Sequence, residues 1–143
     1  MSGLTKALAD FLDGQPVGVL ATSSGGGVVH QSLVYFVRDG EEILISTLGG
    51  RRKALDVTET GRASLCVMGH ERPFPSVTVS GRAEIRRSAI GEPTALIAQL
   101  IMGVPEPPEQ QSDEALAAVD RVILALHIDR VGPASYIDED STG

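Results

Sequence analysis

The sequence predicts a mainly β protein, a six-stranded antiparallel β-barrel of Greek-key type with peripheral α-helices. The first observation behind this prediction is that six short segments are either continuously apolar or alternate between apolar and polar residues, as strands do. The second is that hairpin signals separate the early segments. The third is that helical spacing of apolar residues is confined to the N-terminal end and to two insertions between predicted strands.

The predicted strands share this apolar or alternating character and lie at residues 17–22, 28–37, 42–47, 63–68, 76–86 and 122–128. A Gly/Ser turn over residues 23–27 and the pair Asp39-Gly40 join the first three strands as hairpins. Two prolines interrupt the polar stretch over residues 70–75, which is therefore expected to be a loop. Gly81 predicts a β-bulge within the fifth strand. The chain from Gly132 onward is expected to be irregular.

Apolar residues at helical spacing predict helices at about residues 2–13, 51–60, 92–102 and 113–119. Gly61 and Gly103 follow the second and third helices, where a glycine commonly ends a helix. Asp113 is expected to cap the fourth helix. The second helix is expected to turn one stripe inward, formed by Ala54, Leu55, Val57 and Thr58.

Length and composition limit the classes of protein that this sequence can encode. A chain of 143 residues fits one domain, residues 1–143, with a sizeable hydrophobic core. Hydrophobic residues make up 42% and charged residues 22%, as in ordinary globular proteins. The net charge of −7 and the aromatic content of 3% argue against binding of nucleic acid, which needs a basic surface or stacking side chains.

The cysteine content and the lengths of the apolar runs indicate where the protein is located. The single cysteine, Cys66, cannot form an internal disulfide, and its apolar neighbours predict a packed core thiol. No apolar run is long enough to span a membrane, and no signal peptide is recognisable. A cytoplasmic protein without membrane contact is therefore expected.

The junction between the third strand and the second helix gathers most of the chemistry-bearing residues. The strand ends in Ser46 and Thr47, and a tight turn at Gly49-Gly50 leads into a helix that opens with Arg51, Arg52 and Lys53. A helix start has unpaired backbone N–H groups and the positive end of the helix dipole. An anion such as a phosphate group is therefore expected here, held by the arginine fork, the lysine charge and a strand-end hydroxyl.

The basic residues and the glycine pair of this junction also occur in other kinds of site. Three basic residues on a surface turn also occur as an ordinary solvated face. The spacing of a P-loop is absent, and Gly49-Gly50 lacks the third glycine of a dinucleotide-binding fingerprint. The local pattern thus leaves a single phosphate group or a solvated face.

Four segments carry a resemblance to a known family. They are GVLAT at 18–22, STLGGRRKAL at 46–55, RASLCV at 62–67 and VTVSGRAEI at 77–85. With them, nearly the whole chain resembles the pyridoxamine 5′-phosphate oxidase-like split β-barrel proteins, which bind FMN, and most closely their actinobacterial branch that uses the deazaflavin coenzyme F420. The pair Arg51 and Lys53 is the most specific part of the match.

The resemblance implies a cofactor site and a partner. In this family the pair corresponding to Arg51 and Lys53 binds the cofactor phosphate, and the groove lies between the two subunits of a homodimer. Arg52, Ser46 and Thr47 belong to the same expected site. Three further polar residues are expected near the ring or the phosphate, and these are Gln31, Ser32 and Ser76. The C-terminal end lacks the substrate-phosphate arginine and histidine of the pyridoxamine phosphate oxidases proper, so pyridoxine phosphate is not the expected substrate.

Three functions on this fold remain open at the level of sequence. The first is an F420-dependent oxidoreductase that transfers a hydride to a small conjugated or heteroaromatic substrate. The second is an FMN-dependent oxidoreductase, and the third is a non-catalytic flavin- or haem-binding protein. The double cation Arg51-Arg52, with Arg38 and Arg72 in neighbouring loops, is expected to face the anionic tail that F420 has and FMN lacks, which favours the first.

The sequence assigns no catalytic side chain and no metal site. The cofactor supplies the reactive atom in such reactions, so the protein needs to bind and orient rather than attack. His30, His70 and His127 are far apart in sequence and lack metal-ligand spacing, so structural or solvated histidines are expected.

Overall fold

The computed structural model describes residues 3–138, and the predictions for residues 1–2 and 139–143 lie outside this range. Eight strands form one antiparallel sheet in the order β2-β1-β5-β6-β7-β4-β3, with β8 paired to β6. The strands are β1 (Val17–Ser23), β2 (Val29–Tyr35), β3 (Val37–Asp39), β4 (Glu42–Leu48), β5 (Arg62–Met68), β6 (Ser76–Arg86), β7 (Arg121–His127) and β8 (Arg130–Ser135). The helices are α1 (Lys6–Asp13), α2 (Arg52–Thr60), α3 (Gly91–Met102) and α4 (Asp113–Ala118).

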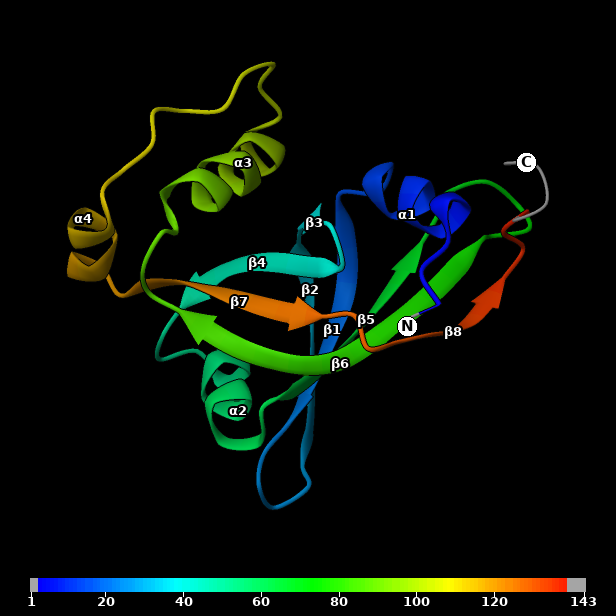
Figure 1. Cartoon of the computed structure of the whole chain (residues 1–143), viewed down its shortest axis with the longest axis horizontal. Coiled ribbons are helices and arrows are strands. Elements are labelled where there is room, and N and C mark those ends of the chain that lie inside the picture. Colours follow the sequence, from blue (N-terminus) through cyan, green and yellow to red (C-terminus); the bar gives the residue numbers. More distant parts are fainter. Residues whose placement is uncertain (1–2, 139–143) are drawn as a thin grey trace.

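The mainly β, split-barrel fold class is confirmed, although the described residues form eight strands instead of six (Figure 1). The expected strand over 28–37 breaks at Phe36, whose side chain turns into the core and whose N–H bonds to Pro16. The short strand β3 follows this break. β8 was expected to be irregular, and it forms because residues 130–135 run along the first half of β6.

The sheet curls because β6 is long and changes neighbours along its length. Its first half pairs with β5 and β8, and its second half pairs with β7. Gly81 lies at the changeover. A Cβ atom there would lie 2.2 Å from the carbonyl oxygen of His127, so only glycine allows the two backbones to approach this closely. The predicted bulge at Gly81 is wrong, since the pairing with β5 is regular through this residue and the irregularity falls between Val77 and Val79 opposite β8.

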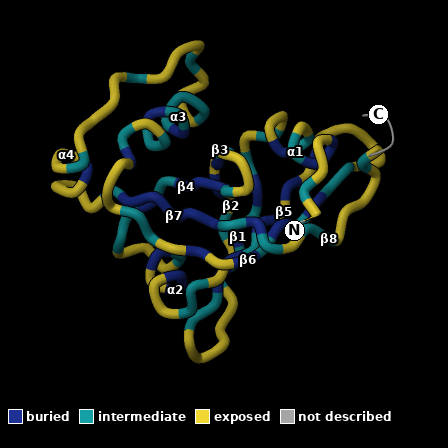
Figure 2. Tube along the Cα trace, viewed as in Figure 1, coloured by how far each residue is buried: buried dark blue, intermediate teal, exposed yellow. Residues whose placement is uncertain are grey.

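The core fills the inside of the curl, as the buried segments in Figure 2 show. Alternate residues of β1, β4, β5, β6 and β7 supply it, which is the period of two that strands impose. Its completely buried members include Leu20, Ile43, Leu65, Val79 and Leu124. A second, smaller cluster packs α3 and α4 against the other face of β4 and β7.

Capping residues determine where α2 and α3 end and where α4 begins. Gly61 and Gly103 adopt left-handed φ angles of 68° and 66°, which confirms both as helix-terminating glycines. The prediction that Asp113 caps α4 is wrong, because Ser112 is the N-cap residue and accepts a bond from the N–H of Ala115. The Asp113 carboxylate instead accepts N–H bonds from Ala89 and Ile90, which fasten the start of α3 to α4.

Candidate anion-binding site

The turn between β4 and α2 is held by backbone bonds at both of its ends. The N–H of Gly49 donates to Asp120 at 2.9 Å, and the N–H of Arg51 donates to Leu48 at 3.0 Å. A Cβ atom on Gly49 would lie 2.6 Å from the carboxylate of Asp120, so the absence of a side chain at Gly49 lets that carboxylate lie against the turn. The turn therefore fixes the direction in which α2 starts.

The first turn of α2 offers unpaired N–H donors. Arg51 is the N-cap residue and its side chain makes no capping bond. Its carbonyl oxygen accepts from the N–H groups of Ala54 and Leu55, both at 3.0 Å. Within residues 3–138 no acceptor lies at the N–H groups of Arg52 and Lys53. These two donors, at the positive end of a helix dipole, suit an anion.

The structure brings the expected cations together at these donors. Arg51 and Arg52 are exposed, whereas Lys53 is half-buried. Burial and then the nearby positive charge of Arg51 lower the pKa of the Lys53 ammonium. An anion bound between Arg51 and Lys53 would offset both effects, because it would replace lost hydration and screen the repulsion between the two cations.

Ser46 and Thr47 point to opposite faces of β4, as successive strand residues must. Thr47 lies on the side of the barrel core and is 5% exposed, and the described residues give its hydroxyl no hydrogen-bond partner. Ser46 pairs with Ile123 and lies on the face that α3 and α4 cover. The two hydroxyls thus cannot serve one cradle from the same side, and Thr47 is the one on the side of the barrel interior.

Two arginines that the sequence pattern did not indicate, Arg87 and Arg121, lie at the end of the sheet where β4 meets α2. Arg121, at the start of β7, pairs with Leu48 at the end of β4. Arg87 follows the end of β6, and its guanidinium lies 2.9 Å from where a Cβ atom of Gly49 would be. In Figure 1 the ends of β4 and β6 and the start of β7 lie together near α2. Only the pairing of distant strands brings these residues together, so no local pattern could have revealed them.

Arg38 and Arg72, expected to face an anionic tail, lie elsewhere. The guanidinium of Arg38 donates to both carboxylate oxygens of Asp13, at 2.8 and 2.7 Å, and to the carbonyl oxygen of Gly40 at 2.8 Å. Arg72 stands over the ring of Phe74 at 5.8 Å, in the loop after β5. That loop is at the far end of β5 from α2, about 20 Å along seven strand residues. In a single chain neither arginine belongs to the junction.

Of the remaining expected site residues, Gln31 and Ser32 lie on the β1–β2 hairpin, and Ser76 lies away from the junction in a single chain. Gln31 and Ser32 are neighbours on β2 and point to opposite faces, with Gln31 exposed and Ser32 on the core side opposite Leu20. Ser76 begins β6 and pairs with Met68, at the end of β5 that is remote from α2. The structure therefore brings together Arg51, Arg52, Lys53 and Thr47, and leaves Ser76 apart from them.

The outer face of β2, β1 and β5 is uncovered and partly apolar. Residues that are partners across the strands share this face, and one row of partners runs from Leu33 through Val19 to Cys66. Leu33 is 76% exposed, and Met68 on the same face is 50% exposed. The prediction of a packed Cys66 is wrong, because the alternation of β5 turns Leu65 and Val67 into the core and Cys66 outward.

A buried carboxylate on α2 was also missed. The buried residues of α2 are Ala54, Asp56 and Val57, so Ala54 and Val57 of the predicted stripe are confirmed. Leu55 and Thr58 of that stripe are exposed. Asp56 is completely buried, and its Oδ2 accepts bonds from Thr22 Oγ1 at 2.8 Å and from His30 Nδ1 at 2.7 Å. His30 thus has a structural partner on α2.

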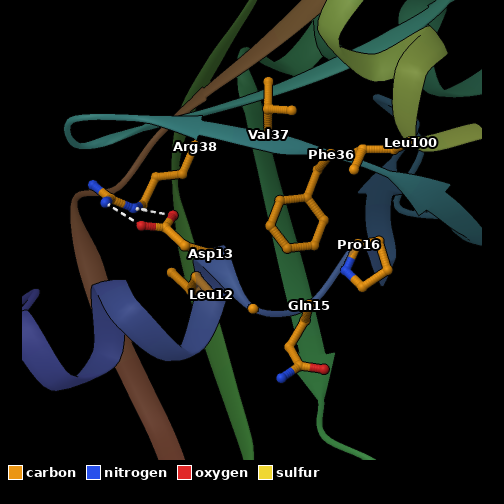
Figure 3. A pocket seen from close by; sticks show the side chains of 9 residues that line it. Leu12, Asp13, Gln15, Pro16, Phe36, Val37, Arg38 and Leu100 are labelled. Carbon is orange, nitrogen blue, oxygen red and sulfur yellow. Dashed lines mark hydrogen bonds and ion pairs between the residues drawn. The ribbon is translucent and has the colours of Figure 1, made fainter. Parts of the chain in front are cut away.

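A hollow of about 420 Å³ lies away from the junction, between the end of α1, β3 and Leu100 of α3 (Figure 3). Its wall is apolar apart from Gln15 and the Asp13–Arg38 pair, in which the arginine is already bonded.

No group of three or more metal-ligating side chains occurs within residues 3–138, and no helix in this range is long and apolar enough to cross a membrane.

Comparisons with known proteins place this geometry in a wider context. A family model described as pyridoxamine 5′-phosphate oxidase matches residues 4–133. A search of curated proteins finds no significant match. Among solved structures, a conserved hypothetical protein from Mycobacterium tuberculosis has a TM-score of 0.73 at 22% identity and covers 96% of this chain and 88% of its own.

Two further solved structures are similar to this chain. One described as an F420 reductase has a TM-score of 0.68 at 24% identity and covers 86% of this chain and 94% of its own. A haem storage protein from Vibrio cholerae has a TM-score of 0.66 at 16% identity and covers 95% of this chain and 98% of its own. At these identities the likeness establishes a common fold.

Proposed function

The chain belongs to the pyridoxamine 5′-phosphate oxidase family, and from that premise we propose that it is an oxidoreductase that binds the deazaflavin coenzyme F420 at the junction of β4 and α2. The observation that carries this proposal is the position of Arg51 and Lys53 beside the two unpaired N–H groups that open α2. A likeness to a structure described as an F420 reductase supports the choice of cofactor.

The residues of the junction fit a phosphate group chemically. Arg51 offers a planar fork of N–H donors, and Lys53 offers a compact charge that burial has already partly stripped of water. The unpaired N–H groups of Arg52 and Lys53 add two fixed donors, and the Thr47 hydroxyl adds a neutral one from the strand end. When bound, the cofactor would supply the hydride that reduces a small conjugated or heteroaromatic substrate, and the protein would bind, orient and exclude water.

We propose a homodimer in which the uncovered face of β2, β1 and β5 meets a second copy. A stable interface buries about 800 Å² on each partner, and its core is apolar. The row through Leu33, Val19 and Cys66 gives such a core on this face. A shallow hollow of about 330 Å³ on the same side, lined by Ala21, Ser64 and Ser80 among others, would become part of a groove between subunits.

Preference for F420 over FMN rests on the cations beyond the phosphate position. F420 carries an anionic glutamyl tail, whereas FMN ends at its phosphate. Arg87, which lies beside Gly49, and Arg121, which pairs with Leu48 at the end of β4, would face this tail in place of Arg38 and Arg72. Attraction between such exposed charges and a tail should weaken as salt rises.

The second candidate function is that of a haem-binding protein without catalysis, which the likeness to a haem storage protein favours. FMN is the alternative cofactor at the same phosphate position. The three ligands have different visible spectra, so titrating purified protein with F420, FMN and haem at low and high salt distinguishes them. We expect F420 to bind most tightly at low salt and to lose most of this advantage at high salt. Equal affinity for F420 and FMN at low salt, or tightest binding of haem, would contradict the proposal.

A further inference from the structure

Asp56 carries the most unusual environment of any carboxylate among the described residues. Its side chain is 0% exposed and lies where α2 packs on the β1–β2 hairpin. Oδ2 accepts from Thr22 on β1 at 2.8 Å and from His30 on β2 at 2.7 Å. A carboxylate can only accept, so Nδ1 of His30 carries the proton and donates it. One oxygen atom therefore joins three chain segments.

The other oxygen of Asp56 is not satisfied. Oδ1 has no hydrogen-bond partner among residues 3–138, and the nearest cationic atom, Nη1 of Arg52, is 3.8 Å away. Burial raises the pKa of the Asp56 carboxyl, but the bonds from Thr22 and His30 outweigh burial and leave the pKa below its usual value. A buried, incompletely bonded anion costs free energy that a neutral residue would avoid. A buried carboxylate that is kept at this cost is expected to have a function.

The location of Asp56 suggests what that explanation is. It lies three residues after Lys53 and four after Arg52, on the inward face of the same helical turn. The hairpin that it binds carries Gln31 next to His30. The carboxylate thus connects the turn that bears the phosphate-binding cations to the β1–β2 hairpin, whose Ala21 lines the hollow proposed as part of the groove.

We propose that Asp56 is a positioning residue of the cofactor site. Through Thr22 and His30 it fixes the start of α2 relative to the β1–β2 hairpin, so that Lys53 and the two free N–H groups meet the phosphate while the hairpin meets the rest of the cofactor. Asp56 itself does not touch the cofactor. This inference rests on the proposed function.

A purely electrostatic role and a positioning role of Asp56 predict opposite changes in cofactor affinity when Asp56 is replaced by Asn. Asp56→Asn removes a negative charge close to an anion site, so Coulomb's law alone would strengthen cofactor binding. Loss of the anchor would weaken it instead, since the charge-assisted bonds from Thr22 and His30 become neutral ones. The matched control is Glu59→Gln, which removes the same charge from an exposed position on the same helix.

The experiment is a titration of F420 and FMN into the wild type, Asp56→Asn and Glu59→Gln, at temperatures where circular dichroism shows each to be folded. We expect the affinity of Asp56→Asn to fall about tenfold, and that of Glu59→Gln to stay the same or rise. Binding by Asp56→Asn as tight as that by Glu59→Gln would overturn the inference while leaving the proposed function intact. A wild type that binds neither cofactor would overturn both.

A second pair of variants keeps the inference testable if Asp56→Asn fails to fold. His30→Gln retains an N–H donor for Asp56, whereas His30→Leu does not. We expect His30→Gln to bind the cofactors several-fold more tightly than His30→Leu. A merely structural role would lower the thermal stability of both variants and leave the affinities of the folded proteins equal, and that result would overturn the inference.

Discussion

Lys53 is the residue on which cofactor binding should depend most strongly. Its ammonium is half-buried and lies near Arg51, so its pKa is lowered before any ligand binds. A hydrogen bond to a charged group contributes about 1.5 to 3 kcal/mol. Lys53→Met keeps the apolar stem and removes the charge, so we expect affinity for F420 to fall roughly ten- to one-hundred-fold in a fluorescence titration.

The matched control is Lys6→Met, the same substitution at the other lysine of the chain. Lys6 forms an exposed ion pair with Asp10 on α1, and such pairs contribute little to stability. Its loss should leave cofactor affinity unchanged. Arg51→Lys should also weaken binding, because the charge stays but the planar fork is lost. Unchanged affinity in both Lys53→Met and Arg51→Lys would mean that the cluster is a solvated face.

At the residue scale, local pattern correctly predicted that a helix starts at Arg51, Arg52 and Lys53 and that Gly61 and Gly103 end helices, since both depend on neighbours in sequence. It failed for Asp56 and Cys66 for one reason. The inward stripe of a short helix and the exposed face of a strand depend on what packs against them, and this is decided by distant segments. Asp56 is buried because Thr22 and His30 meet it there, and Cys66 is exposed because nothing among residues 3–138 covers that face.

At the scale of elements, the turn between β7 and β8 is pinned to β6 by one carboxylate. Asp129 accepts from the Arg82 guanidinium at 2.7 and 3.0 Å and from the Arg82 backbone N–H at 2.9 Å. These bonds hold the pKa of the Asp129 carboxyl far below its usual range. They therefore connect β6 and β7 close to the changeover at Gly81.

This lowered pKa predicts a pH dependence of stability. Because the folded carboxyl releases its proton more readily than the unfolded one, its contribution is fully present above the unfolded pKa of about 3.9 and is lost as the pH falls toward the folded pKa. Urea unfolding of the wild type and Asp129→Asn should show a constant difference in unfolding free energy between about pH 5 and 8 and a shrinking one below about pH 4. A difference that grows on acidification would rule out this account of Asp129.

The sequence predicted elements well where they are defined by their own periodicity. β6 has the predicted bounds because its alternation is strict over residues 76–86. The break at Phe36 and the strand β8 were missed, because one depends on a core position and the other on an edge of β6 that is open for pairing. The clustering of Arg87 and Arg121 at the junction depends in the same way on the order β6-β7-β4.

At the scale of the whole molecule, the uncovered sheet face leads to a prediction about assembly. Leu33→Glu places a charge on the edge strand of that face, in the apolar row with Val19 and Cys66, and a buried unpaired charge would be too costly for an interface to form. Sedimentation should show a dimer for the wild type and a monomer for Leu33→Glu, with weaker cofactor binding in the variant.

The control for assembly is Val119→Glu, a substitution of another exposed apolar residue, 62% exposed, just after α4. It should leave the dimer intact because α4 lies against β7, away from β2. A wild type that sediments as a monomer and still binds F420 would contradict the groove between subunits.

The central claim is that the start of α2 holds the phosphate group of the cofactor. A crystal structure of the protein with F420 tests it most directly, since phosphorus and its oxygens give strong density. We expect the phosphate within hydrogen-bond distance of the N–H groups of Arg52 and Lys53, with Arg51 and the Lys53 ammonium as its charged partners. A phosphate bound elsewhere, such as in the hollow beside Leu100 or the one lined by Ala21, Ser64 and Ser80, with the start of α2 facing only solvent, would contradict the account.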